Sequence, residues 1–361
     1  MKRDWSNCQN ILCIRVDNMG DVMMSSPAVR ALKESFSCKV TLLTSPKGEK
    51  LARLFPFVNE VIACNAPWVK SEKNDEAKDF LNLVEKLKER KFDACVIFTV
   101  YSQNPMPAIL LAYLAGIPLR LAYCRENPYE LLSDWVPDQE PFSYIKHQVQ
   151  RDLDLVAHVG ATTADVGYRV KIEEEVKQSV VGKLKEYGLP GRFLVFHCGV
   201  SEPKRRYPDK QWVDIAKLTL ADLDIPILFT GTNDETNYVD NIQRQVGGKS
   251  VSVTGVFSLE EFIYLLKKAS VVLSVNTSTI HLCSAVQTPV AVLYAQTNPQ
   301  HTPWKADYTL MEYSIPEELK SNNEVIRYVD RHLYAKKIDY PSPESVLGSL
   351  KGLLSISLNT A

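Results

Sequence analysis

The chain has almost no net charge. Its 361 residues include 42 Lys and Arg against 43 Asp and Glu, a formal net charge of -1 with neutral histidines. Proteins that bind nucleic acids usually concentrate basic residues, because each neutralised phosphate releases counterions. We therefore expect no nucleic acid among the partners of this protein.

Long apolar runs are also missing. No stretch approaches the roughly 18 uninterrupted apolar residues of a membrane span, and the segment near 108–115 ends at Gly116 and Pro118. Residues 1–10 contain no apolar signal-peptide core, so we expect the protein in the cytoplasm. The eight cysteines form no Cys-x-x-Cys pair and several lie in apolar segments, which argues against disulfides and metal binding.

Motifs that identify several common enzyme classes are absent as well. There is no GxxxxGK[ST], no GxGxxG after the first predicted strand, no HExxH and no GxSxG. The sequence therefore does not favour an ATPase, a classical dehydrogenase or a serine hydrolase. Two Asp-x-Asp strings, at 152–154 and 222–224, could hold a metal with a diphosphate. The first falls in a predicted helix and the second precedes a predicted strand, so we expect both on the surface and no essential metal.

The remaining composition is that of a globular protein, with 45% apolar and 24% charged residues. At roughly 150 residues per domain, the length predicts two domains. In both halves, apolar runs typical of buried strands alternate with segments of helical periodicity, as in a doubly wound parallel α/β sheet. The predicted strands cover 10–16, 39–44, 60–64, 94–99, 193–197, 225–230, 271–275 and 290–294.

Two interruptions divide this pattern. Residues 117–147 contain several prolines and tyrosines, so we expect loops there. The Tyr-Gly-Leu-Pro-Gly string at 187–191 is the strongest turn signal in mid-chain and marks a domain boundary just before it. The predicted divisions are 1–185, 186–335 and a terminal helical segment, 336–361.

Asp21 is the first candidate for chemistry. It follows Gly20 in the turn between the first predicted strand and the first helix, where open α/β sheets place their ligands. A carboxylate there could take a proton from a substrate hydroxyl, or it could cap the helix and interact with its dipole. Asp17 is a weaker candidate for the same role. The residues alone leave this choice open.

A cationic loop is the second candidate. Lys204, Arg205 and Arg206 follow the strand at 193–197 and precede a predicted helix with Pro208 near its start. Guanidinium groups pair with two phosphate oxygens at once, which suits a diphosphate. A solvated run of charge has the same composition, and the position after a strand favours phosphate.

Small polar residues form the third candidate. Asn276, Thr277 and Ser278 follow the strand at 271–275 and open a predicted helix, whose free amides could bind an anion. The same residue types would also cap a helix, and spacing does not separate the two roles. His281, one turn further, could donate to a phosphate or hold the loop backbone.

The strand at 225–230 ends in the fourth candidate, which contains Gly231 and Glu235. A carboxylate at this edge of a sheet can accept hydrogen bonds from ribose hydroxyls. The alternative is an ordinary surface acid at a helix start.

Taken in this order, the strings resemble glycosyltransferase family 9, which includes the ADP-heptose:lipopolysaccharide heptosyltransferases. Each string is weak alone, and the ordered set is specific and spans nearly the whole chain. The matching segments are 11–16, 20–22, Pro27-Ala28, 203–208, Gly231 with Glu235, 276–281, 296–299 and Pro303-Trp304.

The resemblance implies a GT-B fold, in which two Rossmann-like lobes face a central cleft. Residues 1–185 would bind the acceptor, 186–335 would bind the nucleotide sugar, and the helix in 336–361 would pack back on the N-terminal lobe. The implied reaction is inverting and metal-independent. It moves a heptose or related sugar from a nucleotide diphosphate-sugar, ADP-linked, to a hydroxyl of a glycan, glycolipid or small molecule.

The resemblance also assigns roles to residues. Asp21 would be the catalytic base, with Gly20 and Asp17 in the same turn. The donor diphosphate would be bound by Lys204, Arg205, Asn276, Thr277, Ser278 and His281, and the nucleoside by Gly231, Glu235, Thr254, Gly255 and Leu259. No cofactor is implied, and a cytoplasmic enzyme of this type has room for a peripheral contact with the inner membrane face.

Two departures from the family pattern leave alternatives open. The phosphate-loop lysine of the family is Arg205 here, or is displaced to Lys204, and the usual glycine after Thr277 is Ser278. Ser278 adds bulk where the backbone should approach the ligand. A catalytically silent nucleotide-sugar-binding subunit is therefore one alternative. A nucleotide-sugar epimerase would share the two-lobed architecture, but the further cleft acids and histidines that it should bring are not found in the sequence.

Overall fold

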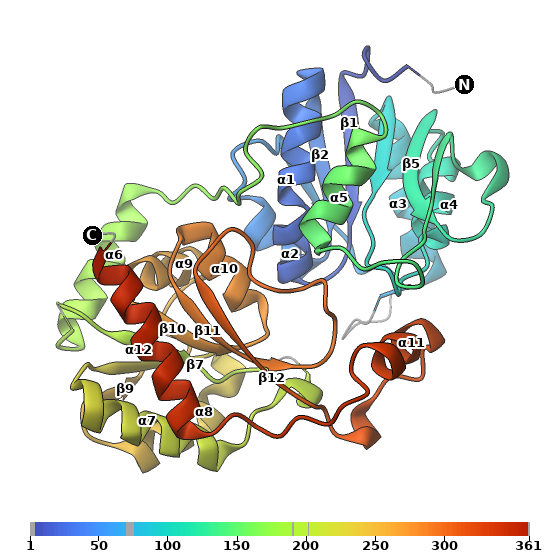
Figure 1. Cartoon of the computed structure of the whole chain (residues 1–361). Helices are drawn as coiled ribbons and strands as arrows, with labels where there is room; N and C mark the ends of the chain where they lie inside the picture. Colours follow the sequence, from blue (N-terminus) through green and yellow to red (C-terminus); the bar gives the residue numbers. More distant parts are fainter. Residues whose placement is uncertain (1–3, 70–75, 190, 201, 360–361) are drawn as a thin grey trace. The chain divides into compact units, whose positions relative to one another are not determined.

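The computed structural model describes residues 4–69, 76–189, 191–200 and 202–359. The chain divides into two compact units (Figure 1). The first contains Met1–Lys171 and Asn323–Tyr328, and the second contains Ile172–Asn322 and Val329–Ala361. Each unit is an α/β sandwich in which helices cover both faces of a parallel sheet, as the sequence predicts.

The first unit is built on a six-stranded sheet, over its described residues, with the order β3-β2-β1-β4-β5-β6 and parallel pairing throughout. Helices α1, α2 and α5 pack together, and α3 packs on α4. The strands are β1 (Asn10–Arg15), β2 (Lys39–Thr44), β3 (Glu60–Ala63), β4 (Ala94–Ile97), β5 (Leu119–Cys124) and β6 (Asp134–Pro137). The helices are α1 (Met19–Phe36), α2 (Pro46–Ala52), α3 (Ala77–Glu89), α4 (Met106–Leu114), η1 (Tyr129–Leu131) and α5 (Gln148–Ala157).

The second unit repeats this arrangement with the order β12-β11-β10-β7-β8-β9, again parallel throughout. Its strands are β7 (Leu194–His197), β8 (Ile227–Thr230), β9 (Ser250–Ser252), β10 (Val271–Val275), β11 (Val290–Ala295) and β12 (Tyr308–Tyr313). Its helices are α6 (Glu174–Glu186), η2 (Pro203–Arg205), α7 (Asp209–Leu223), η3 (Asn233–Glu235), α8 (Thr236–Val246), α9 (Leu259–Lys268), α10 (Ser278–Val286), η4 (Glu317–Leu319) and α12 (Pro343–Asn359). Helix α11 (Glu324–His332) has residues in both units.

Both sheets therefore have the strand order 3-2-1-4-5-6 when each is counted from its own first strand. Strands one to three lead toward one edge of the sheet and strands four to six toward the other, so the strand order reverses between the first and fourth strands. Ligands of such sheets bind beyond the carboxyl ends of these two strands. The relevant pairs are β1 with β4 and β7 with β10. The central strands are buried on both faces, which explains why the sequence shows them as continuous apolar runs.

The prediction of loops across residues 117–147 was wrong. This region contains β5, which is buried almost throughout, and the edge strand β6. Pro118 precedes β5 and Pro137 ends β6, so neither proline removes a hydrogen-bond donor from the middle of the sheet. Whether this region forms strands depends on where each proline lies relative to the sheet, and not on the number of prolines.

The expected packing of the C-terminal helix on the N-terminal lobe was also wrong. Helix α12 packs on α7, β10, β11 and β12 of its own unit (Figure 1). Its apolar residues Val346, Leu350, Leu353 and Leu354 belong to the same buried cluster as Trp212 and Ile215. These four residues recur at helical spacing and form one apolar stripe. This face of α12 is therefore the one buried against the second sheet.

The boundary between the units lies earlier than residue 186. Helix α6 belongs to the second unit, where it packs on α9, and Lys183 of α6 pairs with Glu261 of α9. The turn at 187–191 therefore separates a helix from β7 within one unit. Within the described ranges, no helix combines the length and the apolarity that a membrane crossing needs.

Candidate functional site

In the first unit, a buried charge cluster lies at the carboxyl end of β1. Arg15 is the last residue of this strand, and its side chain is fully buried. Its Nε lies 3.0 Å from Oδ2 of Asp17, and its Nη2 donates to Oδ1 of Asp21 over 2.8 Å. Although burial disfavours the cation, these carboxylates and that of Asp152 raise the pKa of Arg15 above its ordinary value.

Asp21 lies in the first turn of α1, as expected. The helix begins at Met19, and Asn18 precedes it without forming a side-chain cap. Gly20 is buried in this turn and does not use the left-handed conformation that a tight turn would have needed. The carboxylate of Asp21 reaches back to Arg15, and its side chain is 14% exposed.

Asp17 is held by a second loop of the same unit. Gln103, which follows β4, donates from Nε2 to Oδ1 of Asp17, and its own Oε1 accepts from the backbone N–H of Val100. Burial raises the pKa of Asp17 to about 6, Arg15 opposes this rise, and the nearby charge of Asp21 adds to it. The loops after β1 and β4 are thus joined at the switch point of the sheet.

The expectation that both Asp-x-Asp strings lie on the surface was wrong for Asp152. Its side chain accepts hydrogen bonds from Ser25 over 2.6 Å and from Gln148 over 2.8 Å, because α5 packs on α1 and turns this residue inward. Burial raises the pKa of Asp152 to about 6. Asp222 and Asp224 do lie at the surface, paired with Lys351 and Lys249. Among the described residues, no group of His, Cys, Asp and Glu is arranged to hold a metal ion.

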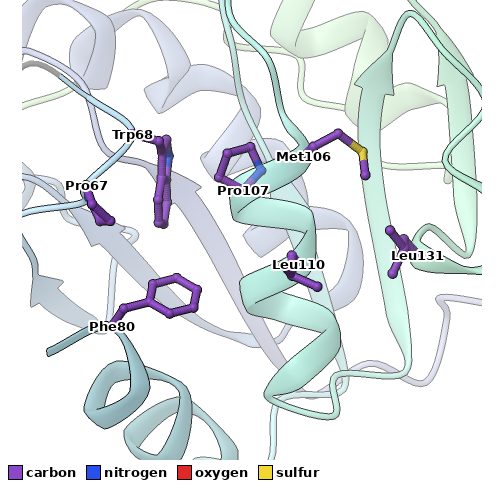
Figure 2. Close-up of a pocket in the computed structure, with 7 residues that line it drawn as sticks. All are labelled: Pro67, Trp68, Phe80, Met106, Pro107, Leu110 and Leu131. Carbon is purple, nitrogen blue, oxygen red and sulfur yellow. The ribbon is translucent and has the colours of Figure 1, made fainter. Parts of the chain in front are cut away.

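The first unit also contains an apolar pocket of about 480 Å³ (Figure 2). Trp68 and Phe80 lie on one side and Pro107 and Leu110 of α4 on the other. Trp68 and Phe80 form an edge-to-face pair with their ring centroids 6.0 Å apart. The remaining lining residues are Pro67, Met106 and Leu131. None of these side chains carries a charge, so the pocket is not suited to a phosphate.

In the second unit, the cationic loop is tied to the start of α10. Arg205 donates from Nη1 to the carbonyl of Asn276 over 3.0 Å, and the hydroxyl of Tyr313 donates to the Arg205 carbonyl over 2.7 Å. Nε of Arg205 is buried and has no hydrogen-bond partner among the described residues. Lys204 pairs with Glu202 over 2.8 Å. The third cation, Arg206, pairs instead with Asp209.

The residues that open α10 contribute differently from one another. The amide of Asn276 binds Ala295 and Thr297 after β11, so its side chain holds the two strand ends together. The N–H of Thr277 donates to the carbonyl of Val275 over 2.8 Å, and its role toward a diphosphate stays a prediction. Ser278 is the first helical residue and is partly buried, and His281 is 3% exposed.

The predicted nucleoside residues come together at the carboxyl ends of β7, β8 and β9. The carboxylate of Glu235 accepts from the N–H and the hydroxyl of Thr232 over 2.7 and 2.9 Å. The carboxylate atoms of Glu235 lie 2.2 to 2.5 Å from the position that a Cβ atom on Gly199 would take. One carboxylate oxygen lies 3.1 Å from the position of a Cβ on Gly231. Methyl groups at either position would crowd it. Gly255 has a φ of +72°, which favours glycine, and a Cβ there would meet Asn233.

His197, at the end of β7, lies beside this group. Its Nδ1 is 3.0 Å from the hydroxyl of Thr230, and its ring lies 5.5 Å from that of Phe262. Burial lowers the pKa of His197 to about 4, while Glu235 opposes this shift. The imidazole is therefore neutral at pH 7. Thr254 and Leu259, also predicted here, are partly buried at the end of β9 and the start of α9.

Sequence reasoning missed several residues that complete these sites: Arg15, Gln103, Asp152, His197 and Gly199. Arg15 and His197 end buried strands, and a polar residue at the end of an apolar run is a signal that could have been used. Gln103 and Asp152 carry no comparable signal, because only the packing of their loop and helix turns them inward.

Comparison with known proteins gives consistent results. The model of glycosyltransferase family 9 (heptosyltransferase) matches residues 80–345. Lipopolysaccharide heptosyltransferase 2 of Escherichia coli is 23% identical over 310 residues, which cover 81% of this chain and 84% of the relative. A family 9 glycosyl transferase from Veillonella parvula superimposes with a TM-score of 0.76 at 17% identity, covering 99% of both chains. The E. coli ADP-heptose lps heptosyltransferase II structure gives a TM-score of 0.72 at 20% identity, covering 97% of this chain and 100% of that one.

Proposed function

Since the chain belongs to glycosyltransferase family 9 (heptosyltransferase), we propose that it transfers a heptose from an ADP-linked donor to a hydroxyl of a lipopolysaccharide acceptor. The family resemblance and the two-lobed α/β fold expected from the sequence are confirmed, and the protein is a glycosyltransferase of the heptosyltransferase type. The names of the E. coli relatives support the donor and the acceptor in this proposal.

The observation that carries the proposal is the position of Asp21. Its carboxylate lies one turn into α1, at the carboxyl end of the central strand β1, and a buried arginine holds one of its oxygens. A carboxylate fixed in this way can accept the proton of an acceptor hydroxyl while that oxygen attacks the anomeric carbon. Direct attack opposite the leaving nucleotide would invert the configuration at that carbon.

The leaving diphosphate would be stabilised by the loop of the second unit. Arg205 and Lys204 supply positive charge, and the guanidinium of Arg205 is already oriented by the carbonyl of Asn276. As the bond to the sugar breaks, negative charge grows on the diphosphate, and fixed cations stabilise it most at that point. Ser278 and His281 at the start of α10 would complete the diphosphate site. We propose that the reaction needs no metal because these cations supply the required charge.

The nucleoside would occupy the group around Glu235. A carboxylate anchored by Thr232 presents acceptor oxygens to ribose hydroxyls, and Gly199 and Gly231 leave room for it. The strip formed by Thr254, Gly255 and Leu259 would border the base. Neutral His197 can form hydrogen bonds here without adding a positive charge.

Replacement of the base tests the proposal. We expect Asp21→Asn to bind ADP with unchanged affinity and to lose about 10²- to 10⁴-fold in kcat, since the amide cannot accept the proton. Release of ADP from ADP-heptose in the presence of heptose-free lipopolysaccharide measures turnover. Calorimetric titration with ADP measures binding.

The matched control is Asp222→Asn, on the surface of the second unit, which should leave both readouts unchanged. Full turnover by Asp21→Asn would remove Asp21 as the base. Binding of ADP-heptose by the unaltered protein without acceptor-dependent ADP release would instead favour the silent-subunit alternative.

A further inference from the structure

We propose that Arg15 and Asp17 form a positioning pair that holds the carboxylate of Asp21 in place and sets the charge around it. The inference rests on the proposed role of Asp21 as the base. Neither residue touches the reacting atoms in this proposal, so both act through Asp21.

The geometry of Arg15 supports the positioning role. Its guanidinium contacts both carboxylates at once, with Nε 3.0 Å from Asp17 and Nη2 2.8 Å from Asp21. Its side chain is fully buried at the end of a central strand. A planar donor group in such a site allows few other orientations, so it fixes the rotamer of Asp21.

Asp17 is fixed in turn by a separate segment of the unit. Gln103 donates to the Asp17 oxygen that does not face Arg15 and is itself held by Val100. The chain of contacts therefore runs from the loop after β4, through Asp17 and Arg15, to the first turn of α1. Rotation of Asp21 away from this position would break its hydrogen bond to Arg15.

The charges in this cluster act on Asp21 in opposite directions. Arg15 stabilises the ionised form of Asp21 and so weakens it as a base. Asp17 shares the same guanidinium and repels the charge on Asp21, which strengthens the base. Asp152, which contacts Ser25 of α1, also acts on Arg15, and Arg151 lies beside it on α5. With one buried arginine among three aspartates, loss of a single charge shifts the balance.

Substitutions at the two positions should shift the pH profile of kcat in opposite directions. Asp17→Asn removes one of the carboxylates that share Arg15, so Arg15 acts more strongly on Asp21, the acid limb should move to lower pH and the plateau should fall. Arg15→Met removes the cation, so the acid limb should move to higher pH, and kcat should fall about 10- to 100-fold as Asp21 loses its fixed position. Arg15→Lys should restore part of this loss, and KM for ADP-heptose should stay unchanged in all three variants.

Arg120 supplies the matched control. It is a buried arginine of β5 in the same sheet, and it donates to the carbonyls of Leu131 and Glu130. Arg120→Met should lower thermal stability as Arg15→Met does, without moving the acid limb. A merely structural role for Arg15 would make the two profiles alike, and that result would overturn the proposal.

A second readout needs no turnover. Carboxyl resonances of ¹³C-labelled aspartate, assigned through Asp21→Asn and Asp17→Asn, report the titration of Asp21 directly. Its midpoint should rise in Arg15→Met and fall in Asp17→Asn, and an unmoved midpoint in both variants would refute the inference. If Asp21→Asn keeps full turnover, the proposed base fails. If Asp21→Asn is inactive while the Arg15 and Asp17 variants keep the parental profile and midpoint, only the positioning pair fails.

Discussion

At the scale of single residues, three of the predicted functional side chains have a hydrogen-bond partner that restricts them. Asp21 is held by Arg15, Arg205 by the carbonyl of Asn276, and Glu235 by Thr232. Arg15 ends β1, Asn276 follows β10 and Thr232 follows β8, so each partner lies at or just after the end of a strand. The orientation of each group is thus fixed before any ligand is present, which reduces the cost of ordering on binding.

Gly199 offers a test of the nucleoside group. A methyl group there would lie within 2.5 Å of the Glu235 carboxylate, so Gly199→Ala should push this flexible side chain away. We expect the Kd for ADP to rise about tenfold, equivalent to about 1.4 kcal/mol, as measured by calorimetric titration. The matched substitution is Gly182→Ala in α6, where nothing lies within 4 Å of the added carbon. Equal ADP affinity in both variants would separate Glu235 from the nucleoside site.

At the scale of elements, the strand-to-helix connections carry the chemistry and the helices provide the packing around it. β1 leads into α1, β7 into the cationic loop, β8 into the segment with Glu235, and β10 into α10. Helix α12 is different, because it contributes no residue to either site and instead completes the core of the second unit.

Leu350 of α12 tests that packing role. Its side chain is fully buried in the cluster that includes Trp212, so Leu350→Ala should lower the free energy of unfolding by about 2–5 kcal/mol. The control is Ile356→Ala in the same helix, where the side chain is 42% exposed and a change below about 0.5 kcal/mol is expected. Denaturant titration measures both values, and a Leu350→Ala cost as small as the control would contradict the assignment of α12 to this core.

At the scale of the whole molecule, two units with the same strand order carry different chemical groups. The first unit gathers carboxylates around one buried arginine, and the second gathers cations and glycines. The near-zero total charge of the chain does not reveal this local difference between the two units. This separation suits a reaction that removes a proton at one place and stabilises a diphosphate at another.

Asp152 predicts how stability depends on pH. Burial raises its pKa to about 6 in the folded chain, against about 3.9 when unfolded, so the folded state binds the proton more tightly. The stability associated with this group is complete below about pH 4 and is lost as the pH rises through about 6. The loss is of the order of 3 kcal/mol. Asp152→Asn keeps an acceptor for Ser25 and Gln148, so its free energy of unfolding should fall less than that of the parent between pH 4 and pH 8.

Denaturant titrations at several pH values measure this difference. Asp222→Asn, which removes a surface carboxylate paired with Lys351, corrects for the general effect of losing an acid. Parallel pH curves for the parent and Asp152→Asn would show that Asp152 is ionised as easily in the folded chain as in the unfolded one.

The sequence by itself determined the fold class, the order of most strands and the family, because these depend on local patterns. Buried parallel strands need continuous apolar runs, and the ligand loops must follow their carboxyl ends, so residues such as Asp21, Arg205 and Glu235 could be identified by position. Only the tertiary structure decided which partner each of them has. Arg15 and Gln103 reach Asp17 because parallel strands bring segments distant in sequence to one edge. Asp152 turns inward because α5 packs on α1, and α12 joins the second unit because its apolar stripe matches that core. Such contacts join residues far apart in the chain, and local periodicity carries no information about them.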